Sequence, residues 1–424
     1  MIKVITYGTY DLLHFGHIRL LERAKALGDY LIVGVTSDDY DKTRGKINNQ
    51  QTLMERIAAV EATGLADEII VEEYEGQKID DIKRFDIDIF TVGSDWVGKF
   101  DYLNEYCKVI YLPRTEGVSS TEIRASQRKL RIGAVGDLSI LEKFKQECNY
   151  VNGVELLEGD FSLEDTDAVY VISRPEQHYE HVKEALQAGK HVLCQSPIAI
   201  DEQQCGELLE LAEEKKLILV EGIKTAYATA YSRLVLLVKS GKIGEVLSVD
   251  ATCTSMITAG EKPIEIQKSK INSICTWGPT AMLPIFQILG TDYHEKTIVS
   301  RIVDPGRNYD GFSKIDFLYE NAVASAKVAK TAKSEGELII TGTKGYIYVP
   351  APWWKTDYFE VRYEDPNDNK RYFYQLDGEG IRYEIIAFVN AIKKGRSISN
   401  ISRAESLGIA SVIGDFYKGN YRSI

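Results

Sequence analysis

The stretch "KVITYGTYDLLHFGHIRLLERAKALG", residues 3–28, decides the fold of the first part of the chain. Its first six residues form an apolar run typical of a buried strand. Residues 18–28 have the apolar spacing of an amphipathic helix that ends at a glycine. His14 and His17 stand between the two, and they are two of only six histidines in the chain. Their place between a strand and a helix makes this turn a candidate site.

The alternation of strand and helix continues to about residue 130. Apolar runs at 30–37, 67–74, 88–96 and 108–115 predict strands, and residues 51–64 and 78–85 predict helices. Such alternation builds a parallel, doubly wound, Rossmann-like sheet, whose ligands bind at the carboxyl ends of the strands. We therefore expect an α/β domain over residues 1–130.

The rest of the chain predicts two further domains. The pattern restarts with strands at 130–137, 167–173, 191–196 and 217–222, which indicates a second Rossmann-like domain over residues 131–225. From 226 to 424, long β-rich stretches predict an α+β domain with a large, mostly antiparallel sheet. Helical patterns at 380–395 and 402–417 close the chain.

The composition restricts the class of protein. Of the 424 residues, 44% are hydrophobic and 27% are charged, as in ordinary globular proteins, and the net charge of −12 argues against a nucleic-acid partner. No apolar run reaches the roughly 18 residues of a membrane span, and no secretory leader is expected. The six cysteines are scattered, which predicts neither disulfides nor a zinc site. We therefore expect a cytoplasmic protein.

The turn that holds the histidines suits a phosphate group. A helix that begins there points backbone N–H groups at the strand end, and these groups favour anions. Gly16 allows close approach of the backbone, and the imidazoles of His14 and His17 can donate hydrogen bonds to phosphate oxygens. Two alternatives stay open at this point: a pair of structural histidines, or a metal pair for which only Asp11 is near.

Three stretches in this first part resemble a known family. "GTYDLLHFGHIRLLERAKALGDYLIVGV" (8–35), "VGSDWVGKFDYL" (92–103) and "YLPRTEGVSSTEIR" (111–124) are similar to the HxGH nucleotidyltransferases, and within them to the bacterial glycerol-3-phosphate cytidylyltransferases. The resemblance implies Mg²⁺-dependent transfer of CMP from CTP to a polyol phosphate, with release of pyrophosphate. Glycerol phosphate would give CDP-glycerol, a precursor for teichoic-acid or capsule polymers. Another HxGH transferase that uses ATP is an alternative.

The resemblance also assigns roles to residues. His14 and His17 would stabilise charge on the α-phosphate, while Arg114 and Lys46 would hold the leaving pyrophosphate. Ser119 and Glu122 have the spacing of a capping box, so a helix cap is the alternative there, as a solvated loop is around Lys46. Asp11 could orient a histidine or approach the metal, whose ligands stay unknown. The full set of expected substrate-binding residues is Gly8, Thr9, Tyr10, Asp11, Gly16, Arg44, Arg56, Asp95, Trp96, Thr115, Ser119, Ser120 and Thr121.

The remainder of the chain resembles a second family. Residues 167–200, 213–222 and 239–249 are similar to the glucose-fructose oxidoreductase and inositol dehydrogenase family. That family combines a dinucleotide-binding fold with an open sheet that often forms oligomer interfaces. The resemblance implies a homo-oligomer assembled through the C-terminal sheet.

The residues that oxidoreductase chemistry needs are not in their expected places. Of the glycine fingerprint only Gly136 is present, and Asp137 after it would repel a pyrophosphate. The stretch that follows is shorter than in the family by a strand and a helix. Ser196 replaces the family's lysine, and residues 276–284 contain neither aspartate nor histidine. We therefore expect a redox-inactive module that binds no NAD(P), with His178 and His181 as structural residues.

Three other hypotheses stay open. The first is a bifunctional enzyme that also reduces a keto-polyol phosphate with NAD(P)H, and the second is a non-enzymatic scaffold whose first domain only binds nucleotide. The third concerns a dense aromatic run in the last domain, which indicates either an interface or a buried core strand. Its residues are Trp353, Trp354, Tyr358, Phe359 and Tyr363.

Overall fold

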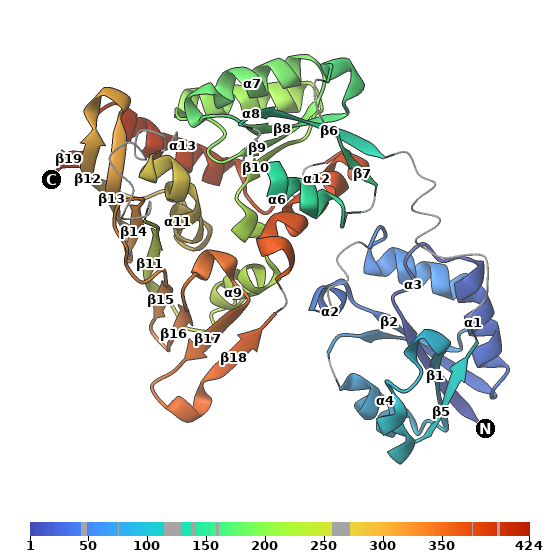
Figure 1. Cartoon of the computed structure of the whole chain (residues 1–424). Helices are drawn as coiled ribbons and strands as arrows, with labels where there is room; N and C mark the ends of the chain where they lie inside the picture. The colour runs from blue at the N-terminus through green and yellow to red at the C-terminus, as the bar shows by residue number, and fades with distance from the viewer. Residues whose placement is uncertain are drawn as a thin grey trace. The chain divides into compact units, whose positions relative to one another are not determined.

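The computed structural model divides the chain into two compact units, Met1–Arg128 and Lys129–Ile424 (Figure 1). Each unit is described by itself. The division expected near residue 225, within the second unit, stays a prediction. The structure describes residues 1–43, 49–74, 76–113, 129–137, 141–151, 153–157, 161–256, 272–374, 376–396 and 399–424, without the side chains of 39, 42, 43 and 307.

The N-terminal unit is built on a five-stranded parallel sheet. Its order is β3-β2-β1-β4-β5, so β1 lies in the centre, with β2 on one side and β4 on the other. The strands are β1 (Lys3–Gly8), β2 (Tyr30–Thr36), β3 (Glu68–Glu72), β4 (Ile89–Gly93) and β5 (Lys108–Leu112).

Helices cover both faces of this sheet, because successive residues of each strand point to opposite sides. Val4 packs with α1 (Phe15–Lys25) and α3 (Leu53–Glu61), whereas Ile5 packs with α4 (Gln77–Phe85). The predicted doubly wound fold is confirmed. The short elements are α2 (Asp38–Thr43), η1 (Ser94–Trp96) and η2 (Asp101–Glu105).

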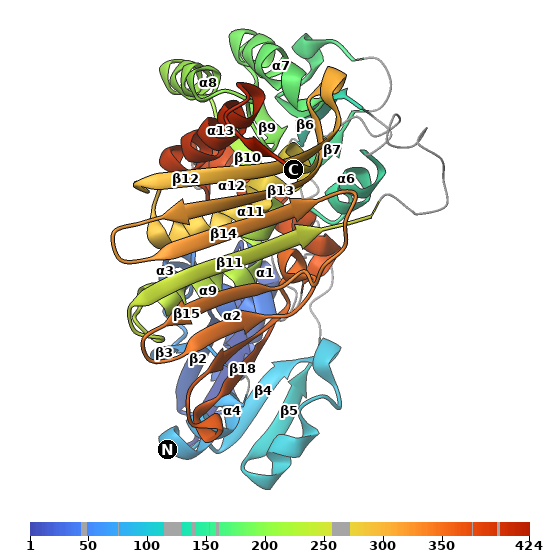
Figure 2. The same cartoon turned by 90° about the vertical axis from the view of Figure 1, so that its left-hand side faces the viewer.

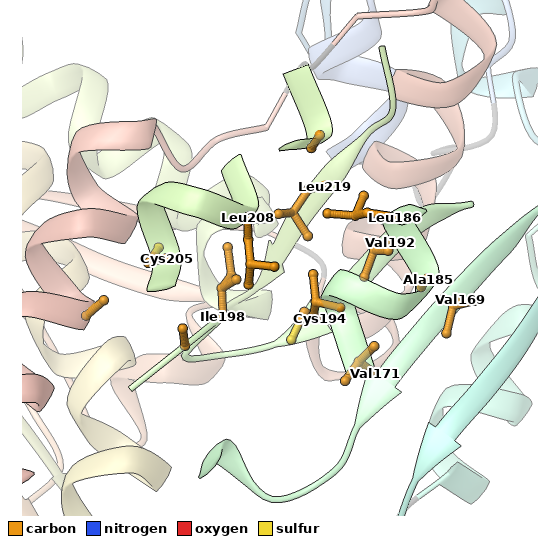
Figure 3. Close-up of a cluster of buried hydrophobic side chains, with 14 residues drawn as sticks. Val169, Val171, Ala185, Leu186, Val192, Cys194, Ile198, Cys205, Leu208 and Leu219 are labelled. Atoms are coloured by element: carbon orange, nitrogen blue, oxygen red, sulfur yellow. The ribbon is translucent and has the colours of Figure 1, made fainter. Parts of the chain in front are cut away.

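The C-terminal unit begins with a second parallel sheet of order β10-β9-β8-β6-β7. Figure 3 shows the apolar cluster between this sheet and α7 and α8, with Val171 and Val192 from strands and Leu186 and Leu208 from helices. The expected loss of a strand after Gly136 is wrong, because the short β7 occupies that stretch. The elements are β6 (Leu130–Gly136), α6 (Leu141–Cys148), β7 (Val154–Leu156), η4 (Leu163–Asp165), β8 (Ala168–Ile172), α7 (Pro175–Gln187), β9 (His191–Gln195), α8 (Glu202–Glu214) and β10 (Leu219–Gly222).

A nine-stranded sheet completes the C-terminal unit (Figure 2). Its order is β18-β17-β16-β15-β11-β14-β13-β12-β19, and all neighbours are antiparallel except β11–β14 and β12–β19. The predicted, mostly antiparallel sheet is confirmed. The strands are β11 (Val246–Thr254), β12 (Glu295–Asp304), β13 (Tyr309–Leu318), β14 (Val323–Ala329), β15 (Leu338–Gly342), β16 (Tyr346–Val349), β17 (Tyr358–Arg362), β18 (Lys370–Phe373) and β19 (Arg422–Ser423).

One face of the nine-stranded sheet is covered by α11, which packs against β11, β13 and β14. The helices of this part are α9 (Thr229–Lys239), α11 (Ser273–Leu289), α12 (Ile381–Lys394) and α13 (Arg403–Tyr417). The short helical turns are η5 (Lys224–Tyr227), η6 (Pro305–Arg307), η7 (Trp353–Lys355), η8 (Pro366–Asp368) and η9 (Asp377–Gly380). Among the described residues, no helix has the length and apolar character needed to cross a membrane.

The aromatic run of the last domain is divided between core and surface. Trp353 and Phe359 are fully buried, and the indole of Trp353 donates a hydrogen bond to the carbonyl oxygen of Thr252. The ring of Tyr358 instead contacts Phe373, whose side chain is exposed. The core interpretation therefore holds for Trp353 and Phe359.

Candidate functional site

A strained turn joins β1 to α1 at the carboxyl edge of the first sheet. Tyr10 and Leu12 both have left-handed backbone angles (φ 53° and 49°), which costs a residue with a side chain about 1 kcal/mol or more. The buried ring of Tyr10 folds back over Gly8, where a Cβ would lie 2.9 Å from the ring. Gly8 is therefore required by the packing of Tyr10.

Asp11 fastens this turn to the segment that precedes α3. Its Oδ1 accepts hydrogen bonds from the backbone N–H groups of Gln50 (2.9 Å) and Gln51 (3.0 Å). The side chain of Gln51 in turn accepts a hydrogen bond from the N–H of Leu12 at 2.8 Å. The structure thus places Asp11 as a buried anchor of the turn.

His14 and His17 lie together at the N-terminus of α1. His14 is the N-cap residue, and its Nδ1 accepts a hydrogen bond from the N–H of Gly16 at 3.1 Å. In the neutral ring this contact puts the proton on Nε2. The imidazoles of His14 and His17 stack with their centroids 3.9 Å apart, and the edge of Tyr10 meets His17 at 5.6 Å. The imidazoles of His14 and His17, which can donate hydrogen bonds, therefore lie at the positive end of the α1 helix dipole.

Thr9 connects the histidine turn to Asp41 of α2, a residue that the sequence did not single out. The fully buried carboxylate of Asp41 accepts hydrogen bonds from the hydroxyl of Thr9 (3.1 Å) and the side-chain amide of Asn49 (3.0 Å). The expected phosphate ligands Arg44 and Lys46 stand between Asp41 and Asn49 in sequence and lie outside the described residues.

Arg56 is fully buried and holds several loops at once. Its Nη1 donates to the carbonyl oxygens of Thr9 (2.6 Å) and Thr36 (2.8 Å), and its Nε donates to that of Gln51 (3.3 Å). Its Nη2 pairs with Asp38 at 2.5 Å. Arg56 therefore joins the segments at the carboxyl ends of β1 and β2 through hydrogen bonds to their carbonyl oxygens. Its expected contact with substrate phosphate stays a prediction.

Asp95 and Trp96 follow β4 at the same edge of the sheet. Since β4 pairs in parallel with β1, the ends of the two strands are neighbours. Asp95 is exposed, and Trp96 packs on Phe100 with Lys99 5.2 Å from its ring centre. This position is compatible with the expected contact to a nucleoside.

The second family signature falls largely outside the described residues. Its last described residue is Pro113, whose carbonyl oxygen accepts a hydrogen bond from Arg23 of α1 at 2.7 Å. The signature therefore begins beside α1. The predicted site residues that the structure does not describe here are Arg114, Thr115, Ser119, Ser120 and Thr121.

A buried charged network lies on the α4 side of the sheet, also at the strand ends. The carboxylate of Glu72 pairs with Lys78 and accepts a hydrogen bond from the hydroxyl of Thr36 at 2.8 Å. The hydroxyl of Tyr7 donates to Asp81 at 2.8 Å, and burial raises the pKa of Tyr7. Only the acidic run at 72–81, which contains Lys78, hinted at this network in the sequence.

The metal question can be tested on the same residues. Within the described ranges, no group of three histidine, cysteine or carboxylate side chains is placed to hold a metal ion. One oxygen of Asp11 is engaged by two backbone N–H groups. Mg²⁺ commonly takes only one or two carboxylates together with substrate phosphates, so the expected Mg²⁺ stays a prediction. The steps proposed below are assigned to protein groups.

The carboxyl edge of the second parallel sheet differs in character. Gly136 has φ 121°, and a Cβ there would lie 2.3 Å from the backbone nitrogen of Ser173, while the N–H of Asp137 donates to Ile172 at 3.1 Å. The hydroxyl of Ser196 donates to the buried carboxylate of Glu221. Three residues at the positions that dinucleotide chemistry would use, Gly136, Asp137 and Ser196, are thus engaged within the protein.

Glu221 and His178 are interior groups of this unit. Burial raises the pKa of Glu221, although the hydroxyls of Ser196 and Ser406 bind its carboxylate. The buried ring of His178 contacts the carbonyl oxygens of Pro197 (Nδ1, 2.6 Å) and Ser173 (Nε2, 2.9 Å). Such contacts agree with the structural role expected for His178.

Comparisons with known families agree with the division into two units. Residues 5–126 match the family model described as cytidylyltransferase-like, and residues 122–223 match that of the oxidoreductase family with an NAD-binding Rossmann fold. The chain is 52% identical over 130 residues to the glycerol-3-phosphate cytidylyltransferase of Bacillus spizizenii, which covers 31% of this chain and all of that protein. It is 48% identical over 124 residues to the same enzyme of Staphylococcus aureus, covering 29% and 93%.

The C-terminal unit is similar in fold to solved oxidoreductases. One is the 3-ketoreductase KijD10 of Actinomadura kijaniata in complex with NADP and TDP-benzene, with a TM-score of 0.58 and 21% identity. That match covers 70% of this chain and 99% of the reductase. At this level of identity the likeness establishes the fold of the unit.

Proposed function

Because the chain belongs to the cytidylyltransferase-like family, we propose that its CTP-dependent cytidylyl transfer uses a polyol phosphate as acceptor. Glycerol phosphate is the acceptor we favour, since two relatives about half identical to the N-terminal unit are named for it. The products are a CDP-polyol such as CDP-glycerol and pyrophosphate. A role in teichoic-acid or capsule synthesis follows from that product.

The proposed reaction is a direct in-line displacement. An oxygen of the acceptor phosphate attacks the α-phosphorus of CTP, a new P–O bond forms, and the bond from that phosphorus to the bridging oxygen of the β-phosphate breaks. The acceptor phosphate is already an anion, so the step requires neither a general base nor a covalent enzyme intermediate. Positioning and charge stabilisation therefore supply the catalysis.

The stacked pair of His14 and His17 is the observation that carries this proposal. The N-cap contact from Gly16 holds the His14 ring in place, and in the neutral ring it leaves the proton on Nε2. His17 lies on the first turn of the same helix. Donors held in this way stabilise charge on the α-phosphate without reorganising during the reaction. In this proposal Arg114 and Lys46 hold the pyrophosphate, and Asp95 and Trp96 contact the nucleoside.

A pyrophosphate-release assay tests the proposal. The full chain is assayed with CTP or ATP against glycerol 3-phosphate, glycerol 2-phosphate and ribitol phosphate, with and without NADPH. We expect release with CTP and at least one polyol phosphate, and no requirement for NADPH. The proposal would be contradicted if pyrophosphate were released with ATP but not with CTP. It would also be contradicted if no polyol phosphate supported pyrophosphate release from CTP.

For the C-terminal unit we propose a redox-inactive role. The engagement of Ser196 by Glu221 and the packing of Gly136 on Ser173 do not suit NAD(P), so no hydride step is assigned. The second candidate is a bifunctional enzyme that reduces a keto-polyol phosphate, which the match to the oxidoreductase family favours. Tight NADPH binding, or NADPH oxidation with a keto-polyol phosphate, would establish the second candidate instead.

Self-association through the outer face of the nine-stranded sheet is the positive role we propose for this unit. Phe373 is 71% exposed beside Tyr358, and the paired residues Leu318 and Val323 are exposed where β13 ends and β14 begins. A second copy of the chain would cover these apolar groups. Sedimentation should show an oligomer that Phe373→Lys weakens, whereas a monomeric wild type would refute this role.

A further inference from the structure

Three lysines of the C-terminal unit converge on one carboxylate. The ammonium groups of Lys355, Lys224 and Lys143 lie 2.7, 3.3 and 3.4 Å from oxygens of Glu379. The lysines come from η7, η5 and α6, three separate parts of the chain. These three lysines are called the lysine cluster below. Lys355 and then Lys224 lower the pKa of Glu379 to about 2.

The lysine cluster carries more positive charge than Glu379 balances. The neighbouring acids Glu147 and Asp377 both face Arg382, at 2.8 and 3.7 Å. Arg382 can balance only one of these two carboxylates. Counted together, the three lysines and Arg382 are four cations against the three carboxylates of Glu379, Glu147 and Asp377, which leaves an excess of one positive charge. Such a local excess favours an additional or stronger anion.

The chain brings Glu379 to the lysines on an unusual loop. Glu379 has a left-handed backbone (φ 54°) between the left-handed Gly378 and Gly380. Gly380 packs on Lys224, since a Cβ there would lie 3.2 Å from the Lys224 carbonyl oxygen. Helix α12 begins at the next residue, and its N-cap residue, Gly380, has no side chain with which to cap it. The positive end of a 14-residue helix therefore adjoins the lysine cluster.

A second, buried carboxyl points to a ligand at the same place. Glu384 lies one turn into α12, is 4% exposed, and its Oε2 has no hydrogen-bond partner among the described residues. Its other oxygen lies 3.4 Å from the position of a Cβ on Gly222, two residues before Lys224. Burial raises the pKa of Glu384 to about 8, while the charge of Lys224 opposes that shift. At neutral pH this carboxyl carries a proton that it can donate to an anion.

From this geometry we infer that the lysine cluster binds the phosphoryl group of a small phosphate ester or of a nucleoside diphosphate. The Glu379 carboxylate is the internal anion that the ligand displaces from Lys224 and Lys355. A phosphoryl group offers more charge and more acceptor oxygens than one carboxylate, so it can contact all three lysines and accept a hydrogen bond from Glu384. All the residues of this site belong to the C-terminal unit.

Calorimetric titration of the full chain tests this inference. The probes are inorganic phosphate, glycerol 3-phosphate and CDP, so that the ester and the nucleotide are distinguished. We expect Lys224→Met and Lys355→Met to weaken binding at one site about tenfold each, as loss of a charge-assisted contact predicts. Glu379→Gln should strengthen the same site by about tenfold because the competing carboxylate is neutralised. Lys344→Met, an exposed lysine outside the cluster, is the matched control.

Binding at the histidine turn is common to all these variants and cancels in the comparison. If Glu379→Gln and both lysine variants titrate as the wild type does, the lysine cluster holds no phosphoryl ligand. An equal loss in Lys344→Met would likewise overturn the inference, since it would report only net charge. Thermal unfolding of each variant establishes that it is folded. The outcome is independent of pyrophosphate release, so failure here leaves the proposed transfer reaction untouched.

Discussion

The two parallel sheets of this protein have similar architecture and differently equipped edges. In the N-terminal unit, the strand ends present the stacked His14 and His17 and the N-terminus of α1. In the C-terminal unit, Ser196 is bound to Glu221 and three lysines face Glu379. The comparison teaches that a sheet of this kind does not determine the chemistry at its edge. That chemistry depends on which side chains stand at the strand ends and on the residues with which they form hydrogen bonds or ion pairs.

The largest effect is expected from His17→Ala in the N-terminal edge. Losing one pre-positioned donor to the α-phosphate should lower kcat about 100- to 1000-fold. Thermal unfolding should change little, because the His17 side chain is only half-buried, in contact with the rings of His14 and Tyr10. The control is His294→Ala, an exposed histidine of the C-terminal unit, which should retain full activity. Equal rates for the two variants would remove the basis for distinguishing the two edges.

Arg56→Met should affect the stability of the N-terminal unit. The substitution leaves the carbonyl oxygens of Thr9, Thr36 and Gln51 without their donor. We expect a loss of about 3 kcal/mol in the free energy of unfolding, measured with urea. Arg19→Met on the surface of α1 is the control and should stay within about 0.5 kcal/mol of the wild type. A fully stable Arg56→Met with weakened CTP binding would instead make Arg56 a substrate ligand.

Glu384→Gln should change the pH dependence of the C-terminal unit. The pKa of Glu384 is raised from its ordinary 4.5 to about 8, so the folded unit binds the proton more tightly than the unfolded chain does. The stabilisation is complete below about pH 4.5 and is lost as the pH rises towards 8. The free energy of unfolding of Glu384→Gln, relative to that of the wild type, should rise by about 2 kcal/mol between pH 6 and pH 8. Urea unfolding at both pH values measures it, and a constant difference would contradict the assignment.

Ser196→Ala should give the smallest effect. The variant removes one of the two serine hydroxyls that donate to Glu221, so the C-terminal unit should lose about 1 kcal/mol of stability. Pyrophosphate release should be unchanged, because Ser196 belongs to the other unit. A large loss of release would show that the second edge contributes to the transfer reaction.

The elements of the fold were predictable because they follow from local patterns. The apolar run at 3–8 and the spacing at 18–28 predicted β1 and α1, and the structure contains both. The proximity of His14 and His17 also followed from sequence, since a helix start brings residues three apart onto one side. The short β7 was missed because three residues carry little pattern.

Contacts between distant loops were beyond sequence reasoning. Arg56 reads as an ordinary polar residue of an amphipathic helix, yet its guanidinium joins loops 47 and 20 residues away. Asp41 and Thr9 are likewise 32 residues apart. The lysine cluster depends on residues 143, 224, 355 and 379, whose meeting is set by the packing of α6, η5, η7 and η9. The local pattern of apolar and polar residues does not predict contacts between residues so far apart in the sequence.

The most direct test of the account is a crystal structure of the full chain with CTP. We predict that oxygens of the α-phosphate lie within about 3 Å of the imidazole nitrogens of His14 and His17, at the N-terminus of α1. CTP bound elsewhere, or both imidazoles turned away from its phosphates, would contradict the assignment of this edge as the site of cytidylyl transfer.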